Sequence, residues 1–307
     1  MIPGTSLDIP PEVIGKARVN GAEQWLDDLP ELIASLERDW SIRVGASYPG
    51  STEALVTQAW LEDGTPAALK LCLPYRGDTP EREITVLRLV NGEGCAKLLR
   101  ADEQRGAMLL ERLGRPMSAL NLPIEQRHDL LCAAAEGIWR PAPSSDLITG
   151  AAKGRWLANF ITTVWEQLDR PCTQRAVDYA LACATRRIEA HDDERAVLLH
   201  GDLHQWNALE AGDGTFKLVD PDGLLAEPEY ELSVIMREDP VELMTGDPRD
   251  RARWLARRCG LDATRIWEWG VVERVSTGLV CTQIDLQPVG RQMLAAAEHI
   301  AAHHAAE

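Results

Sequence analysis

Hydrophobic and polar positions follow two different rhythms along the first part of the chain. Between residues 21 and 40, large apolar residues recur at helical spacing, which predicts an amphipathic helix. Pro30 is expected either to kink this helix or to start a second segment. The short apolar runs 53–61 and 66–73 are joined by Glu-Asp-Gly-Thr, the pattern of a β-hairpin. A flexible loop of small residues, 45–52, is expected before this hairpin.

A change of rhythm near residue 113 divides the chain. Before it we expect a helix over 80–91 and a second hairpin from 96–100 and 107–111. After it the pattern is mainly helical, over residues 124–138, 150–168, 173–192, 247–259, 262–285 and 289–304. Short strands return near residues 196–199, 207–210 and 215–219. The chain is thus predicted to be α+β, with a small β-rich lobe, 1–112, and a larger helical lobe, 113–307.

Composition narrows the choice of partners. The 307 residues include 32 Lys and Arg against 48 Asp and Glu, a formal net charge of −16. This acidity argues against binding to nucleic acid or to an anionic membrane surface, both of which need clustered cations. It is compatible with a cationic ligand.

Targeting signals and redox motifs are both lacking in the sequence. Residues 1–11 show no basic and apolar leader, and no run of 18 apolar residues occurs. The seven cysteines are spread along the chain without a C-x-x-C pair, so they are expected to be reduced core thiols. A cytoplasmic location is the expectation.

The densest group of polar residues follows an apolar strand near residue 199. Asp202 lies in a His-Gly-Asp loop, and Asn207 follows five residues later. A second apolar strand, 217–219, ends in Asp220. Two carboxylates and one carboxamide at strand ends make an oxygen-rich site, and oxygen ligands suit Mg²⁺, which also binds substrate phosphates.

This pattern, His-Gly-Asp-x-His-x-x-Asn followed by a strand and Asp-Pro, resembles the kinase catalytic loop. It resembles the aminoglycoside phosphotransferase family in particular, which implies a protein-kinase-like bilobal fold with ATP and Mg²⁺ as cofactors. The resemblance assigns Asp202 as the catalytic base, and Asn207 and Asp220 as metal ligands. His200 and His204 are expected to support the loop by hydrogen bonds. Because they are four residues apart, zinc binding is the alternative.

The β-rich lobe contains one lysine on an apolar strand. Only five lysines occur in the chain, and Lys70 lies within the apolar segment 67–73. A buried lysine is costly unless it is paired. The family pattern pairs it with a helix glutamate, which we expect to be Glu83 because it shares a helix face with Leu87; Glu81 is the competing partner. By the same resemblance, Lys70 holds the nucleotide phosphates.

Two further segments have family counterparts in nucleotide binding. The phosphate loop departs from G-x-G-x-x-G, since its glycines are only Gly45 and Gly50, but the hydroxyls of Ser51 and Thr52 could cover phosphates. Residues 108–113 match the hinge between the lobes. The resemblance implies that adenine bonds this hinge near Glu111 and Leu113.

More particular segments resemble the streptomycin 6-kinase and hydroxyurea kinase branch of this family. They are residues 220–240, 274–279 and 293–298, together with Trp-Leu and Leu-Pro near residue 26. One departure is Glu231, where the branch usually carries aspartate. The longer side chain changes the expected geometry behind the metal site.

The branch implies a small-molecule acceptor, in the case of streptomycin a cationic aminoglycoside with two guanidinium groups. Its site is therefore expected to be acidic, with Glu238, Asp239 and Glu268 as candidates. Each of the three could instead be a solvated acid on a helix face. Trp267 and Trp269 fit a core better than a stacking platform for cations.

Other functions on the same fold remain open. A kinase for choline, homoserine or another metabolite would keep every catalytic residue. A degenerate kinase that only binds is disfavoured by the intact Lys70, Asp202, Asn207 and Asp220. A protein kinase is disfavoured because no Ala-Pro-Glu segment follows Asp220.

Overall fold

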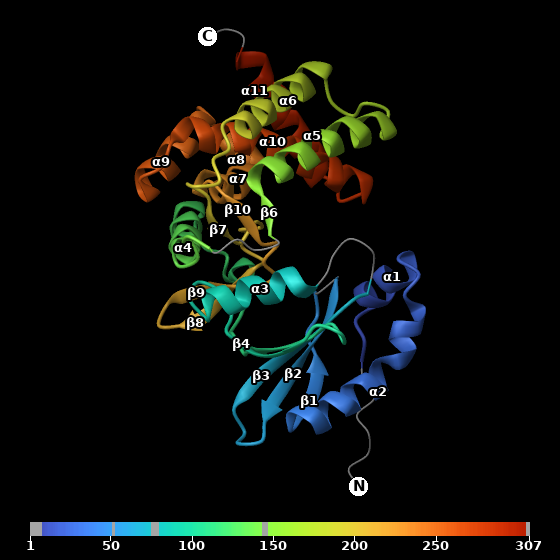
Figure 1. Ribbon diagram of the computed structural model, residues 1–307. Helices are drawn as coiled ribbons and strands as arrows, with labels where there is room; N and C mark the ends of the chain where they lie inside the picture. The colour runs from blue at the N-terminus through green and yellow to red at the C-terminus, as the bar shows by residue number, and fades with distance from the viewer. Residues whose placement is uncertain (1–7, 51–52, 75–79, 143–146, 305–307) are drawn as a thin grey trace. The chain divides into compact units, whose positions relative to one another are not determined.

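The computed structural model describes residues 8–50, 53–74, 80–142 and 147–304. The chain divides into two compact units, an N-terminal unit of residues 1–114 and a C-terminal unit of residues 115–307. Figure 1 labels the elements of both units. Among the described residues, no helix combines the length and the apolar character needed to span a membrane.

An antiparallel five-stranded sheet forms the N-terminal unit, in the order β1-β2-β3-β5-β4. Its strands are β1 (Ile42–Ser47), β2 (Ala54–Leu61), β3 (Pro66–Cys72), β4 (Leu98–Asp102) and β5 (Ala107–Glu111). Its helices are α1 (Pro11–Val19), α2 (Glu23–Trp40) and α3 (Pro80–Val90). Both predicted hairpins are confirmed, and α2 continues through Pro30 as one helix.

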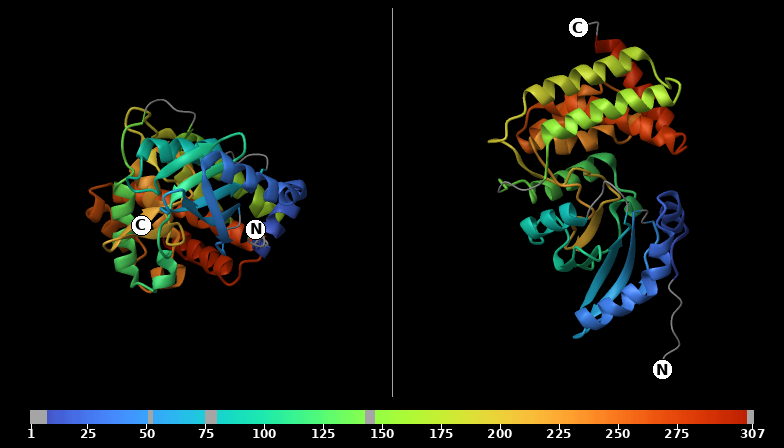
Figure 2. Two further views of the ribbon diagram at one scale, coloured as in Figure 1. Left: turned by 90° about the horizontal axis from the view of Figure 1, so that it is seen from below. Right: turned by 45° about the vertical axis from the view of Figure 1, so that its right-hand side comes forward.

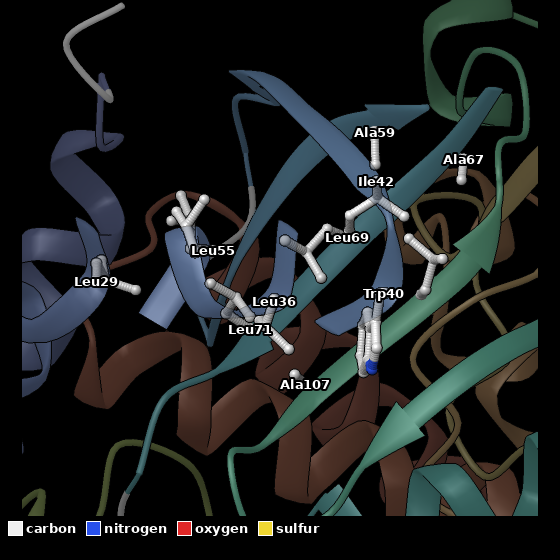
Figure 3. Packing of buried hydrophobic residues seen from close by; sticks show 12 residues of the cluster. Leu29, Leu36, Trp40, Ile42, Leu55, Ala59, Ala67, Leu69, Leu71 and Ala107 are labelled. Atoms are coloured by element: carbon white, nitrogen blue, oxygen red, sulfur yellow. The ribbon is translucent and has the colours of Figure 1, made fainter. Parts of the chain in front are cut away.

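The N-terminal core lies between α2 and one face of the sheet (Figure 3). Leu29 and Leu36 of α2 pack with Leu55, Leu69 and Leu71 of β2 and β3, all fully buried. Since side chains alternate between the faces of a strand, the residue between Leu69 and Leu71 points to the opposite face. That residue is Lys70.

The loop expected over residues 45–52 is partly wrong, because residues 45–47 belong to strand β1. Gly45 lies on this strand, where a Cβ atom would come within 2.6 Å of the Trp60 ring. Glycine is therefore required by the close approach of the indole to the backbone.

Helices dominate the C-terminal unit, which begins with the short 3₁₀ helix η1 (Met117–Leu120). They are α4 (Ile124–Glu136), α5 (Gly150–Gln167), α6 (Gln174–Glu189), α7 (Pro228–Arg237), α8 (Pro240–Leu243), α9 (Arg249–Cys259), α10 (Ala263–Gln283) and α11 (Val289–His304). Helix α10 is buried on almost every side and packs against α5, α6, α7, α9 and α11 (Figure 2). Helix α10 therefore forms the centre of this core, and the charged residues Glu268, Glu273 and Arg274 are buried with it.

Two small sheets carry the loops of the C-terminal unit. Strands β6 (Ile148–Thr149), β10 (Leu224–Ala226) and β7 (Val197–Leu199) form one, and β8 (Ala208–Gly212) pairs with β9 (Thr215–Leu218) in the other. The His-Gly-Asp loop follows β7, and Asp220 follows β9. Helix α7 was not predicted from the sequence. Its residue Glu231 bonds the backbone of the His-Gly-Asp loop.

Candidate active site

A buried glutamate fixes the backbone of the His-Gly-Asp loop. Glu231 of α7 accepts hydrogen bonds from the backbone N–H groups of His200 (2.6 Å) and Gly201 (3.0 Å). Burial raises the pKa of Glu231 to about 7, although the two N–H donors act in the opposite direction. The longer arm of glutamate thus reaches the loop, and the structure shows how the expected departure from aspartate is accommodated.

His200 connects the two loops of the site. Its Nε2 lies 2.8 Å from the carbonyl oxygen of Val219, and its Nδ1 accepts from the backbone N–H of Asp202. The side chain is fully buried, which lowers its pKa to about 4, so the ring is neutral with its proton on Nε2. Because Val219 precedes Asp220, this contact fixes the start of the Asp220 loop.

Asp202 is held by three side chains on two sides of its carboxylate. Oδ1 accepts from Arg237 Nη2 at 2.8 Å. Oδ2 lies 3.0 Å from His204 Nε2 and 3.3 Å from Asn207 Nδ2. Burial alone would raise the pKa of Asp202, but His204 and Arg237 outweigh it and hold the pKa well below its ordinary value. The side chain of Asp202 is 32% exposed, so its ionised and oriented carboxylate remains accessible.

Asn207 and Asp220 form an oxygen donor set that fits Mg²⁺. The amide nitrogen of Asn207 donates to Asp202, so the side-chain carbonyl oxygen of Asn207 points away from Asp202. The backbone carbonyl of Asn207 accepts from Val219 N–H at 2.9 Å, which brings the neighbouring Asp220 close to Asn207. Asp220 is exposed and has a positive φ of 59°. One carboxylate and one amide oxygen suit a magnesium ion that also binds phosphates.

The zinc alternative has no support in the described part of the chain. No group of three His, Cys, Asp or Glu residues there could hold a metal ion. Both ring nitrogens of His200 are taken by hydrogen bonds. His204 has Asp202 at one nitrogen and the backbone N–H of Asn207, 3.3 Å away, at the other. The two histidines brace the loop.

In the N-terminal unit, Lys70 and Glu83 form an ion pair. Lys70 Nζ lies 2.6 Å from Glu83 Oε2, and both side chains are nearly buried. Glu81, the competing partner, is exposed. The pair places one ammonium group on the sheet face opposite the α2 core.

Four further residues were expected to contact the nucleotide: Ser51, Thr52, Glu111 and Leu113. Ser51 and Thr52 lie outside the described residues. The backbone N–H of Glu111 donates to the Lys97 carbonyl, and its carboxylate accepts from Lys97 N–H, so these two groups are engaged within the N-terminal unit. Leu113 is half-buried.

The three acids expected to bind the acceptor differ in their surroundings. Asp239 is ion-paired with Arg127, and Glu268 with both Arg186 and Arg187. Glu268 is therefore a charge-matched residue between helices α6 and α10, which does not support its expected role toward a cation. Glu238 is buried against the loop, where its carboxylate accepts from the neutral Gln205 side chain at 3.3 Å. Burial raises the pKa of Glu238.

Arg237 is the residue of this site that the sequence analysis missed. It was noted within residues 220–240, but nothing in its spacing from Asp202 indicated a contact. The link depends on α7, which brings residue 237 back to the loop beside Glu231.

Comparisons with known proteins identify the family of the chain. The family described as aminoglycoside/hydroxyurea antibiotic resistance kinase matches residues 39–283. A hydroxyurea phosphotransferase from Kitasatospora aureofaciens is 30% identical over 269 residues, which cover 81% of this chain and 77% of that protein. A streptomycin 6-kinase from Streptomyces glaucescens is 30% identical over 278 residues, or 86% and 87% of the two chains.

A solved structure shares the fold. A thermostable mutant of aminoglycoside phosphotransferase APH(4)-Ia, in complex with ADP and hygromycin B, superposes with a TM-score of 0.62 at 14% identity. The match covers 87% of this chain and 97% of the other. The predicted α+β, protein-kinase-like fold is therefore confirmed. With a family match over most of its length, the chain belongs to the aminoglycoside/hydroxyurea antibiotic resistance kinases, which are phosphotransferases.

Proposed function

We propose that this protein transfers the γ-phosphoryl group of ATP, in the presence of Mg²⁺, to a hydroxyl of a cationic aminoglycoside such as streptomycin, and thereby confers resistance. The observation that carries the proposal is the Asp202 carboxylate, which is ionised, held by three side chains and still one-third exposed. Two relatives, each 30% identical to this chain, are named as a hydroxyurea phosphotransferase and a streptomycin 6-kinase. The N-terminal lobe would bind the nucleotide, and the C-terminal lobe would carry the catalytic and acceptor-binding residues.

The roles of the chain's own residues follow from their chemistry. Lys70, fixed by Glu83, would bind the α- and β-phosphates, while Asn207 and Asp220 would hold the metal. When bound, MgATP supplies the phosphoryl group and a cation that offsets its charge. Asp202 would orient the acceptor hydroxyl and accept its proton.

The low pKa of Asp202 sets the timing of that proton transfer. A carboxylate with a depressed pKa is a weak base, so it removes little of the proton before the bond to phosphorus forms. In a loose transition state the hydroxyl becomes acidic late, and orientation matters first. Asp202 therefore acts mainly by positioning early and as a proton acceptor late.

Glu238 is the candidate for recognising a positive group of the acceptor. Of the three acids predicted, it is the one whose hydrogen-bond partner among the described residues is a neutral amide. A guanidinium group placed against it would receive a charge-assisted hydrogen bond. Cation binding would also favour the ionised carboxylate that burial disfavours.

The direct test is phosphoryl transfer by the purified chain with MgATP and streptomycin, hydroxyurea, choline or homoserine as acceptor. Streptomycin should be phosphorylated, and Asp202→Asn should lower kcat by about 10²–10⁴-fold while ATP binding is kept. Asp213→Asn, in the exposed β8–β9 turn, is the matched control and should leave kcat unchanged.

Growth gives the second readout. A susceptible bacterium expressing the wild-type chain should tolerate more streptomycin, and one expressing Asp202→Asn should not. If the Asp202→Asn enzyme kept more than half the wild-type rate, Asp202 would not be the catalytic base. Transfer to hydroxyurea alone would overturn the cationic acceptor and leave the kinase in place.

A further inference from the structure

A buried carboxylate outside the proposed chemistry lies directly behind Arg237. Glu273 of α10 is 4% exposed. Its Oε2 accepts from Arg237 Nη1 at 2.8 Å, while Arg237 Nη2 donates to Asp202. The guanidinium group of Arg237 therefore spans from the base to Glu273.

The second oxygen of Glu273 is also occupied. Its Oε1 accepts from the hydroxyl of Tyr230, 2.7 Å away. Tyr230 is fully buried, and its ring is nearly perpendicular to that of Trp269, with the ring centroids 4.9 Å apart. Burial, and after it the nearby Glu273, raises the pKa of Tyr230 well above its ordinary value, so its hydroxyl remains a donor. Donors and acceptors thus alternate without a gap from Tyr230 through Glu273 and Arg237 to Asp202.

The helices that carry this chain of hydrogen bonds are held in close contact. Gly270 of α10 faces Met236 of α7, where a Cβ atom would come within 2.6 Å of the Met236 Cβ. Arg274, also on α10 and almost fully buried, donates to the backbone carbonyls of Met236 and Arg237 at the end of α7. The backbone of Arg237 is therefore fixed by the same helix that fixes its side chain.

We propose that Glu273 is a positioning residue for phosphoryl transfer: it holds the Arg237 guanidinium group in place, so that the carboxylate of Asp202 stays oriented. This inference rests on the proposed role of Asp202. Without the carboxylate of Glu273, the side chain of Arg237 would lose one of the two carboxylates that its guanidinium group bonds. A catalytic side chain keeps its orientation when the residues that bond it are themselves held by further hydrogen bonds, as Arg237 is held by Glu273.

The test is Glu273→Gln, which keeps the shape but not the charge. Tyr230 and Arg237 donate to different oxygens of Glu273, and the amide NH2 group that replaces one of them cannot accept, so one of the two donors loses its partner. We expect kcat to fall about tenfold, with KM for ATP and for the acceptor changed less than twofold. Tyr230→Phe, which frees only Oε1, should lower kcat about two- to threefold. The control is Glu229→Gln, a buried glutamate of α7 that bonds the Asp262 N–H, and it should keep the wild-type kcat.

Coupling to Asp202 separates positioning from general support of the fold. In the Asp202→Asn background, Glu273→Gln should cause no further loss of rate, because the residue it acts through is already neutralised. An equal loss in both backgrounds, a parallel loss of ATP affinity, or an unchanged kcat would each overturn the inference. If Glu273→Gln does not fold, Tyr230→Phe tests the inference by the same measurements: kcat, affinity for ATP and the loss of rate in the Asp202→Asn background.

The same series distinguishes this inference from the proposed function. An inactive Asp202→Asn enzyme combined with a fully active Glu273→Gln enzyme overturns the role of Glu273 alone. Asp202→Asn with the wild-type rate overturns both.

Discussion

At the scale of single residues, the Lys70–Glu83 pair makes the nucleotide proposal testable. Lys70→Ala should raise KM for ATP or lower kcat at least tenfold, because it removes the cation proposed to hold the phosphates. Glu83→Ala should have the same effect in milder form and should also destabilise the protein, since the nearly buried Lys70 loses its 2.6 Å contact with this carboxylate. Steady-state kinetics and thermal unfolding measure the two effects.

Glu81→Ala is the matched control for this pair. Glu81 lies on the same turn of α3 but is exposed, so its loss should change neither KM nor stability. If Glu81→Ala reproduced the Lys70→Ala kinetics while Glu83→Ala was silent, the proposed role of the Lys70–Glu83 pair would be wrong.

His200 predicts a particular dependence of stability on pH. Its pKa is about 4 in the folded protein against an ordinary value of 6.5, so on acidification the unfolded chain takes up the proton first. The stability that neutral His200 contributes is complete above pH 6.5 and is lost as the pH falls toward 4. Relative to His200→Asn, the wild type should lose on the order of 3 kcal/mol of unfolding free energy over this range.

Comparison with the variant is needed because Glu231 acts in the opposite direction. Its pKa is raised to about 7, so its contribution to stability grows as the pH falls through the same range. Glu231 is present in both proteins, and its effect largely cancels in the difference. A difference in unfolding free energy that is constant between pH 4 and 6.5, measured by urea denaturation, would refute the prediction.

The residues of the site were predictable where they follow one another in the sequence. Asp202, Asn207 and Asp220 stand out because a short loop and a hairpin bring them together. Glu268 could not be judged in this way, since its arginine partners lie about 80 positions earlier, on α6. Charge matching between distant helices leaves no pattern in the local sequence.

At the scale of elements, the long helices and the hairpins were predictable, and α7 was not. Residues 229–236 of α7 are all buried, and they include the polar residues Glu229, Glu231 and Ser233, so the sequence does not show which face is covered. Strand β1 was missed for a related reason, because its Gly-Ala-Ser segment resembles a loop. Helix α7 and strand β1 form because of the elements packed or paired against them, which the local sequence does not show.

The contact between α7 and α10 gives a prediction at this scale. Gly270→Ala should destabilise the protein by about 1–3 kcal/mol, because the added methyl group meets the Met236 side chain in a packed core. Gly15→Ala, inside α1 with open space around it, should instead stabilise by up to about 1 kcal/mol. Thermal unfolding of the two variants should therefore shift in opposite directions, and equal shifts would contradict the packing described.

At the scale of the whole molecule, the net charge of −16 should act on the encounter with the acceptor. Raising the ionic strength from 0.1 to 1 M shortens the screening length from about 10 to about 3 Å. KM for streptomycin should rise severalfold over this range, whereas KM for the neutral hydroxyurea should change little. Equal salt dependence for the two acceptors would argue against electrostatic attraction.

The length of the Glu231 side chain sets the spacing that the fold must keep between α7 and the His-Gly-Asp loop. The carboxylate reaches two consecutive N–H groups from a fully buried site, so the spacing between α7 and the loop is matched to the longer arm. An aspartate at residue 231 would be one methylene shorter and would leave those donors unsatisfied unless α7 lay closer to the loop. Residue 231 and the position of α7 can therefore change only together, and Glu231→Asp alone is not a neutral substitution.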